Sequence, residues 1–161
     1  MKWVNKFEEI FISLALLAAT CLVFLNVVLR AFGGGIIWSE ELVRYLIIWV
    51  TFIGSSVCIR EGTHVGIDLL LQIMSGRIKW VLAFIIYLIA ILFSILFITY
   101  SIEFVQFTSA KNQLAPSLSI PMFVVYIVLP VSGLLMVLRY VQKIVKLFRT
   151  NPSQFPKGAS L

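Results

Sequence analysis

Four long apolar runs alternate with short polar segments along the chain. The runs contain one charged residue, Arg44, and they cover residues 10–29, 42–59, 80–102 and 114–138. An α-helix rises 1.5 Å per residue, so about 20 apolar residues cross the hydrocarbon core of a bilayer. The pattern therefore predicts an all-α integral membrane protein with four transmembrane helices, over about residues 10–30, 40–59, 78–107 and 121–148.

The polar segment between the second and third runs carries a short amphipathic pattern. Val65, Leu69 and Ile73 recur at helical spacing, and Leu70 and Met74 extend the same side. This predicts a short interfacial helix over about residues 66–75, lying on the inner surface of the bilayer. Residues 1–149 then form one four-helix membrane domain, and residues 150–161, with two prolines, are predicted to be a flexible cytoplasmic tail.

Two prolines shape the fourth predicted helix. Pro121 suits a first helical turn, where the missing N–H costs nothing. Pro130 lies inside the run, and because proline has no N–H it cannot donate the helical hydrogen bond to the carbonyl of Tyr126. We therefore expect a kink in the fourth helix near that carbonyl.

Composition and charge agree with a membrane location. The chain is 61% hydrophobic and 12% charged, whereas soluble domains average roughly 45–50% and about 25%. The net charge of +6 would suggest nucleic acid in a soluble protein, but here the charges lie at helix ends, so we expect no nucleic-acid partner. Cytoplasmic loops of membrane proteins are rich in Lys and Arg. Placing both termini in the cytoplasm puts ten of the 13 basic residues inside: Lys2, Lys6, Arg60, Arg77, Lys79, Arg139, Lys143, Lys146, Arg149 and Lys157.

Polar residues recur on one side of the second predicted helix. Glu40 and Glu41 precede Arg44 by four and three residues, so we expect the carboxylates to neutralise this arginine near the outer membrane boundary. The group is either a helix start with compatible charges or a fixed contact with another subunit. Thr51 and Ser55 continue the stripe, and for them we favour packing within the chain's own bundle over contact with a partner. Trp49, near the middle of the same helix, is expected to fill a helix–helix contact.

Residues for catalysis or metal binding are sparse. His64 is the only histidine, and it lies in the predicted cytoplasmic loop near Arg60, Glu61 and Asp68, where solvated local hydrogen bonds are the simpler interpretation. The sequence has no cluster of His, Cys and carboxylates at metal-ligand spacing, and no phosphate-binding loop. We therefore predict no enzyme activity and no cofactor. Ionisable residues deep in a membrane mark transport pathways, and none is predicted here, so the chain resembles a partner of a transporting protein.

Several motifs together resemble a known family. The segment Trp38-Ser39-Glu40-Glu41-Leu42-Val43-Arg44-Tyr45 is followed by Trp49, Phe52, Gly54, Arg60, Gly62, His64 and Asp68. Asn26-Val27-Val28-Leu29-Arg30 precedes it, and Ser117-Leu118-Ser119-Ile120-Pro121 follows it with Tyr126 and Pro130. In order and spacing these residues resemble the small membrane subunit (DctQ type) of tripartite ATP-independent periplasmic (TRAP) transporters. The likeness covers about residues 8–140, and Ser119 departs from it because the family often has glycine there.

The resemblance implies a function that composition alone does not. TRAP transporters import organic acids, such as C4-dicarboxylates or sialic acid, across the bacterial inner membrane by using a sodium gradient. A periplasmic protein binds the substrate, and a large membrane subunit carries it by an elevator-like movement. The small subunit is implied to be a static scaffold that anchors the large subunit among the membrane lipids and contacts the binding protein transiently.

The resemblance also suggests which residues make contacts. Trp38, Glu40, Glu41 and Arg44 are expected to help form an outer contact with the large subunit, whereas Arg60, His64 and Asp68 would organise the inner loop. The alternative is a stand-alone four-helix membrane protein, either a small exporter or a membrane subunit of a respiratory complex.

Overall fold

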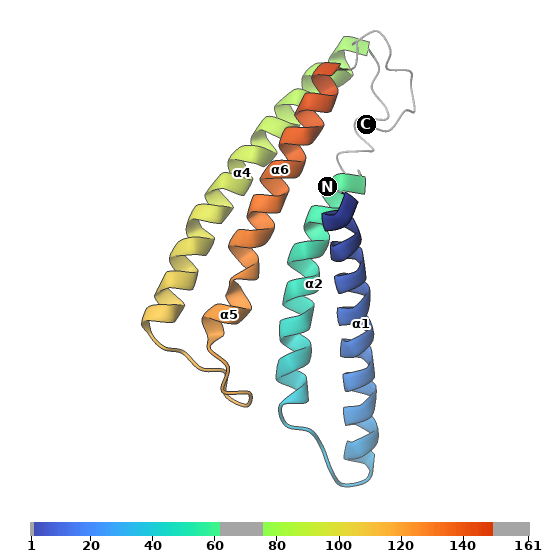
Figure 1. Ribbon diagram of the computed structural model, residues 1–161, viewed down its shortest axis with the longest axis vertical. Coiled ribbons are helices and arrows are strands. Elements are labelled where there is room, and N and C mark those ends of the chain that lie inside the picture. Colours follow the sequence, from blue (N-terminus) through green and yellow to red (C-terminus); the bar gives the residue numbers. More distant parts are fainter. Residues whose placement is uncertain (1, 62–75, 150–161) are drawn as a thin grey trace.

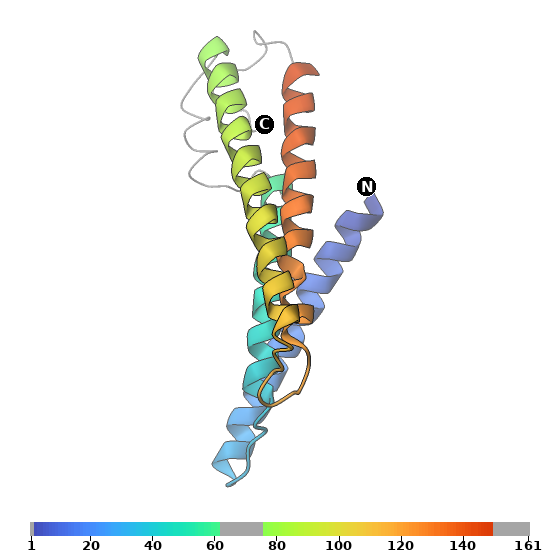
Figure 2. The same ribbon diagram turned by 90° about the vertical axis from the view of Figure 1, so that its left-hand side faces the viewer.

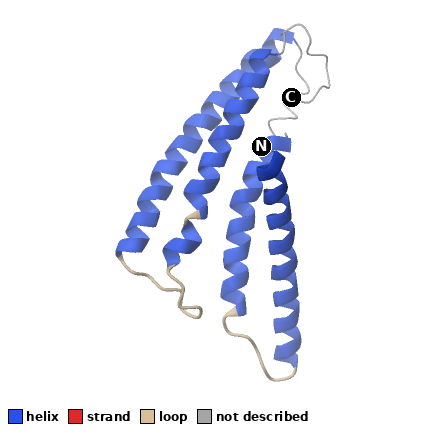
Figure 3. Ribbon diagram, in the orientation of Figure 1, coloured by secondary structure: helices blue, strands red, loops and turns tan. Residues whose placement is uncertain are grey.

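Five helices make up the described part of the chain. The computed structural model describes residues 2–61 and 76–149. The helices are α1 (Lys2–Ala31), α2 (Ser39–Glu61), α4 (Gly76–Ala110), α5 (Met122–Tyr126) and α6 (Val128–Arg149). Within these ranges the remaining residues form turns and loops, and the only β pairing there is an isolated bridge between Leu114 and Pro121 (Figure 3).

The helices confirm the prediction of four membrane spans. Four stretches are long and apolar enough to cross a bilayer: Asn5–Ala31, Ser39–Glu61, Ile78–Ala110 and Met122–Arg149. The first helix starts earlier than the apolar run, because no residue between Lys2 and Ile10 breaks a helix. The predicted interfacial helix over residues 66–75 and the predicted tail over residues 150–161 lie outside the described residues.

The four spans pack as two hairpins placed side by side (Figures 1 and 2). α1 packs against α2, α4 packs against α6, and α2 joins the hairpins by packing against α6. The order across the molecule is therefore α1, α2, α6, α4, with α1 and α4 at the edges (Figure 1). This open arrangement leaves every helix with a large exposed face. We call the end where α1 begins and α6 ends the inner end, following the predicted orientation, and the opposite end the outer end.

Two small hydrophobic clusters hold the hairpins. At the inner end, Ile59 of α2 joins buried residues of α4 and α6: Ala83, Tyr87, Tyr140 and Leu147. At the outer end, Tyr45 packs with Ala115 and Val125. Between the clusters α4 and α6 approach closely at Gly133, where an added Cβ would lie 2.6 Å from Cγ1 of Ile98. A glycine at this point permits close contact of the two helices, as is common in membranes.

The fourth span is interrupted where the prolines predict it. α5 begins directly after Pro121 and ends at Tyr126, and α6 resumes at Val128. Ile127 lies between them. The amide of Val131 donates a long hydrogen bond, of 3.4 Å, to the carbonyl of Ile127. Pro130 has no N–H to donate to the carbonyl of Tyr126, which accounts for the interruption at this level.

A compact loop joins α4 to α5 at the outer end. Asn112 follows the end of α4 with φ 46°, and Ser119 has φ 53°. Asparagine tolerates this left-handed region, but serine pays a steric penalty there. Two backbone hydrogen bonds of 2.9 Å close the loop. The amide of Ala115 donates to the carbonyl of Ile120, and the amide of Ser119 donates to the carbonyl of Ala115.

Ser119→Gly is expected to stabilise the protein by roughly 0.5–1 kcal/mol. Glycine relieves the left-handed strain, and its greater freedom in the unfolded chain offsets part of the gain. Denaturant unfolding in detergent micelles measures the change. Ser117→Gly is the control, because Ser117 is not among the residues at positive φ and its replacement should give no gain. Equal gains from both variants would contradict the assignment of strain to Ser119.

Candidate functional site

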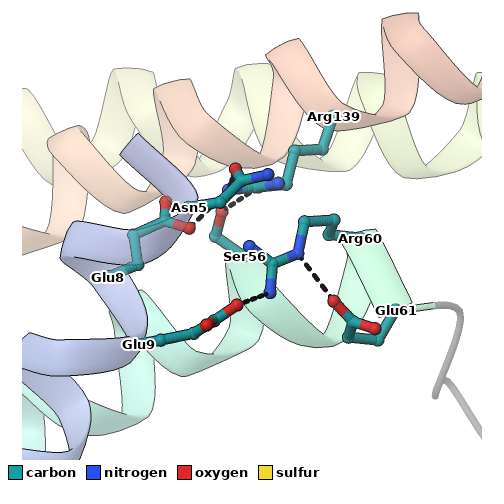
Figure 4. A network of polar contacts seen from close by, with 7 residues as sticks. All are labelled: Asn5, Glu8, Glu9, Ser56, Arg60, Glu61 and Arg139. Carbon is teal, nitrogen blue, oxygen red and sulfur yellow. Dashed lines mark hydrogen bonds and ion pairs between the residues drawn. The ribbon is translucent and has the colours of Figure 1, made fainter. Parts of the chain in front are cut away.

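A buried polar network joins three helices at the inner end (Figure 4). Arg139 of α6 forms an ion pair with Oε2 of Glu8 in α1. Its Nε donates to the hydroxyl of Ser56 in α2 at 2.7 Å, and its Nη2 also donates to Oδ1 of Asn5 at 3.2 Å. Glu8 is 3% exposed, Ser56 0% and Arg139 7%. The side chain of Arg139 therefore crosses the small residue Ser56 to reach α1, and it connects the two hairpins.

A second, more exposed network lies beside the first. Arg60 at the end of α2 forms ion pairs with Glu9 of α1 and with Glu61, the latter at 2.7 Å between Nε and Oε1. The carboxylates of Glu9 and Glu61 are more than half exposed. Exposed ion pairs contribute little to stability, so the buried pair is the stronger constraint. Of the residues predicted to organise the inner loop, His64 and Asp68 lie outside the described residues.

The outer cluster is arranged differently from the sequence prediction. Glu40 forms an ion pair with Arg30 at 2.7 Å, and this pair links the ends of α1 and α2. Glu41 accepts hydrogen bonds from the hydroxyl of Tyr45 at 2.5 Å and from the amides of Ser117 and Leu118 at 2.8 and 3.2 Å.

The structure therefore shows no direct ion pair between Arg44 and either carboxylate, although Glu41, whose hydrogen-bond partners are neutral, lines the same cavity as Arg44. The ion pairs among residues 2–61 and 76–149 do not include Arg44. Helical spacing alone favours pairing of Arg44 with Glu40 or Glu41. In the structure, Arg30 and the amides of the outer loop bind the carboxylate oxygens instead, and these groups lie outside α2.

A cavity of about 360 Å³ lies between α2 and the outer loop. Its lining combines charged, aromatic and aliphatic side chains: Ile37, Glu40, Glu41, Arg44, Tyr45, Ile48, Pro116, Ser117, Met122 and Tyr126. Both carboxylates in this lining already have partners. Arg44 is thus the charged group of the cavity that is left for an additional ligand.

The two tryptophans that the sequence analysis expected to make contacts, Trp38 and Trp49, occupy different environments. Trp49 donates its indole N–H to the carbonyl of Val125 at 3.1 Å, and its ring lies 5.9 Å from that of Phe11. Trp49 therefore fills a contact between α1, α2 and α5, as expected. Trp38, just before α2, is 41% exposed, which suits a side chain at the headgroup level.

Of the polar stripe on α2, Thr51 does not pack in the chain's own bundle and Ser55 packs there only in part. Thr51 is exposed and Ser55 is half-buried. Their hydroxyls donate to the carbonyls of Ile47 and Thr51 within α2, at 2.8 Å each. The preference for internal packing is wrong for Thr51, because α1 and α6 contact other sides of α2.

Comparison with known proteins identifies the family. The family model described as "Tripartite ATP-independent periplasmic transporters, DctQ component" matches residues 19–150. The chain belongs to the DctQ family.

Three relatives show how the DctQ region is used. A Haemophilus influenzae protein named as a TRAP transporter small permease is 32% identical over 152 residues, covering 91% of this chain and 93% of the relative. The sialic acid TRAP transporter permease SiaT of the same species is 30% identical, with 97% of this chain matching 25% of that protein. The C4-dicarboxylate small permease DctQ of Rhodobacter capsulatus is 28% identical, with 68% of this chain matching 48% of the relative.

Membership of the DctQ family confirms the main sequence prediction. The chain is a membrane-embedded small permease subunit of a TRAP transporter, and the family is non-enzymatic. This replaces the alternatives of a stand-alone exporter or a respiratory-complex subunit. In SiaT, the DctQ region makes up only a quarter of a longer permease polypeptide.

The sequence analysis missed the buried inner network of this DctQ protein. Glu8 and Arg139 flank the first and fourth apolar runs and are separated by 131 residues. Spacing rules detect pairs three or four residues apart, so they give no signal for this pair. A weaker signal was available, since a carboxylate and a guanidinium that border apolar runs each need a partner when they are buried.

Glu41→Gln is expected to loosen the outer loop of the DctQ fold. The amide keeps the shape of the side chain but loses the charge that strengthens three hydrogen bonds. Hydrogen exchange at the amides of Ser117 and Leu118 should become faster, as measured by mass spectrometry in micelles. Glu40→Gln is the matched control, because Glu40 contacts Arg30 instead of the loop. Unchanged exchange in the Glu41 variant would contradict the role of its carboxylate as the loop anchor.

Proposed function

We propose that this chain is the non-translocating scaffold subunit of a sodium-coupled importer of organic acids. It would anchor the large elevator-type membrane subunit, and a periplasmic binding protein would deliver the substrate. The observation that carries the proposal is the buried inner network. Sliding the hairpins past one another would separate Arg139 from Glu8, and separating a buried ion pair costs about 3–5 kcal/mol. A subunit fastened in this way suits a static role.

The names of relatives support the substrate class and the partner. The relatives include permeases named for sialic acid and for C4-dicarboxylates, so we propose an organic acid of one of these classes. The DctQ region of SiaT is continuous with a permease segment three times its length. We therefore propose that the partner of this chain is the corresponding large permease subunit.

Charge supports the proposed placement in the bacterial inner membrane. With both termini in the cytoplasm, the basic residues gather at the inner end of the helices. Anionic lipids attract such residues by about 1 kcal/mol each. The outer end, with Trp38, Glu40 and Arg44, would then face the periplasm, where the binding protein docks transiently.

The test combines reconstitution with locking of the two hairpins. The rings of Phe52 in α2 and Phe97 in α4 lie 5.8 Å apart. Cysteines at these two positions, in a chain with Cys21 and Cys58 replaced by alanine, can be joined by a short bifunctional thiol reagent. The locked chain should support sodium-dependent uptake with the large subunit and binding protein at the rate of the unlocked chain.

Two results would contradict the proposal. Loss of uptake on locking, with the unlocked double-cysteine chain still active, would show that the hairpins move during transport. Uptake by the large subunit and binding protein at an unchanged rate without this chain would show that no scaffold is needed.

A further inference from the structure

One side of α2 faces away from both helices that pack against it. Its members recur at spacings of three or four residues: Glu40, Arg44, Ile47, Thr51, Ser55 and Cys58. Ile47 is 52% exposed, Cys58 is exposed, and Ser55 is half-buried. We call this set the outward face of α2. It extends over nearly the whole membrane span.

The chemistry of this face differs from that of the exposed face of α6. Over most of the helix, the α6 face consists of branched aliphatic residues: Val131, Leu134, Leu138, Val141 and Val145. Large aliphatic side chains suit lipid tails, whereas small and hydroxyl residues allow close helix contacts in membranes. Thr51 and Ser55 bond to their own helix, so they present a compact surface without unsatisfied hydroxyl groups. The outward face of α2 is therefore better suited to a protein neighbour than to lipid.

The outer end of this face carries a guanidinium that has no ion-pair partner within the described ranges. Glu40 is paired with Arg30, and Glu41 holds Tyr45 and the outer loop. Arg44 is exposed, lines the cavity of about 360 Å³, and forms no ion pair within the described ranges. A guanidinium in a cavity is suited to a carboxylate, which it can bind through two hydrogen bonds.

We infer that the outward face of α2 is the docking surface for the large permease subunit, and that Arg44 pairs there with an Asp or Glu carboxylate of that subunit. The inference rests on the proposed function and assigns a surface to it. The small and hydroxyl residues of this face favour this occupant over lipid. In SiaT, moreover, the DctQ region shares one chain with a permease segment three times as long, which keeps that segment within reach.

The first experiment places a photo-crosslinking amino acid on each face. Positions Ile47 and Thr51 sample the outward face of α2, and Leu134 and Leu138 sample the exposed face of α6. Each variant is co-expressed with the large permease subunit and irradiated in membranes. We expect crosslinks to the large subunit from Ile47 and Thr51, and crosslinks to lipid from the two α6 positions.

The outcomes separate the docking surface from the proposed function. Crosslinks to the large subunit only from Leu134 and Leu138 would overturn the assignment of the face while keeping the scaffold role. Lipid crosslinks from both faces, with the large subunit still co-purifying, would do the same. Failure of the large subunit to co-purify with the unaltered chain would instead overturn the proposed function.

The second experiment tests the charge of Arg44. Arg44→Gln should weaken retention of the large subunit on the tagged chain roughly tenfold or more, because its carboxylate partner would be left unpaired. Arg44→Lys keeps the charge without the two-pronged geometry and should retain an intermediate amount. Lys111→Gln removes a charge at the same end, where Lys111 lies over the ring of Phe107, and should have no such effect. Equal retention by Arg44→Gln and Lys111→Gln, with both chains folded by circular dichroism, would overturn the pairing.

Discussion

Replacing Arg139 by alanine is expected to lower the free energy of unfolding by about 3–5 kcal/mol. The variant leaves Glu8, which is 3% exposed, buried without its counter-ion. It also removes the donor to Ser56 and the hydrogen bonds that join α6 to Asn5 and Glu8 of α1. Unfolding by a denaturing detergent in mixed micelles, followed by tryptophan fluorescence, measures the loss.

Two further variants isolate the buried charge as the cause. Glu9→Ala removes a carboxylate from the neighbouring ion pair with Arg60. Because the side chain of Glu9 is 57% exposed, this variant should lower the free energy of unfolding by at most about 1 kcal/mol. The double variant Glu8→Gln/Arg139→Met removes both buried charges and should regain much of the stability lost by Arg139→Ala, since replacing a buried pair by uncharged groups is often nearly neutral. A loss in Arg139→Ala no larger than that in Glu9→Ala would show that the inner pair is not buried in solution.

The inner network also explains why local sequence rules succeed and fail in different parts of this chain. The four spans follow from apolar runs, because a bilayer requires about 20 apolar residues per helix whatever their neighbours are. The break before α6 follows from Pro130, whose effect reaches only four residues back. Both features depend on short segments, and both are present in the structure.

Features that depend on helix packing could not be predicted from the sequence. Arg44 lies at the correct spacing for Glu40 and Glu41, yet Arg30 and two loop amides take the carboxylates. These competitors are brought near α2 only by the turn after α1 and by the position of α5. The outward face of α2 was visible as a polar stripe, but its exposure depends on which sides of α2 contact α1 and α6.

Gly133→Ala is expected to destabilise the protein by about 1–3 kcal/mol, the usual cost of overpacking. The new Cβ would lie 2.6 Å from Cγ1 of Ile98 and 3.1 Å from Cδ1 of Phe97, so these side chains or their helix would have to shift. Alanine improves helix propensity by about 1 kcal/mol, so the net loss is smaller than the strain. The same micelle unfolding assay measures it.

Gly54→Ala gives the opposite expectation in the same fold. Its nearest neighbour would be Cδ1 of Ile12 at 4.0 Å, an ordinary contact, so the helix propensity gain of up to about 1 kcal/mol should remain. Ile98→Ala in the Gly133→Ala background should relieve the clash and restore part of the lost stability, although it also removes apolar contacts of its own. If Gly133→Ala stabilised the protein as much as Gly54→Ala, α4 and α6 would have to be further apart than the structure places them. The two helices of this hairpin would then pack less tightly than a rigid, static subunit requires.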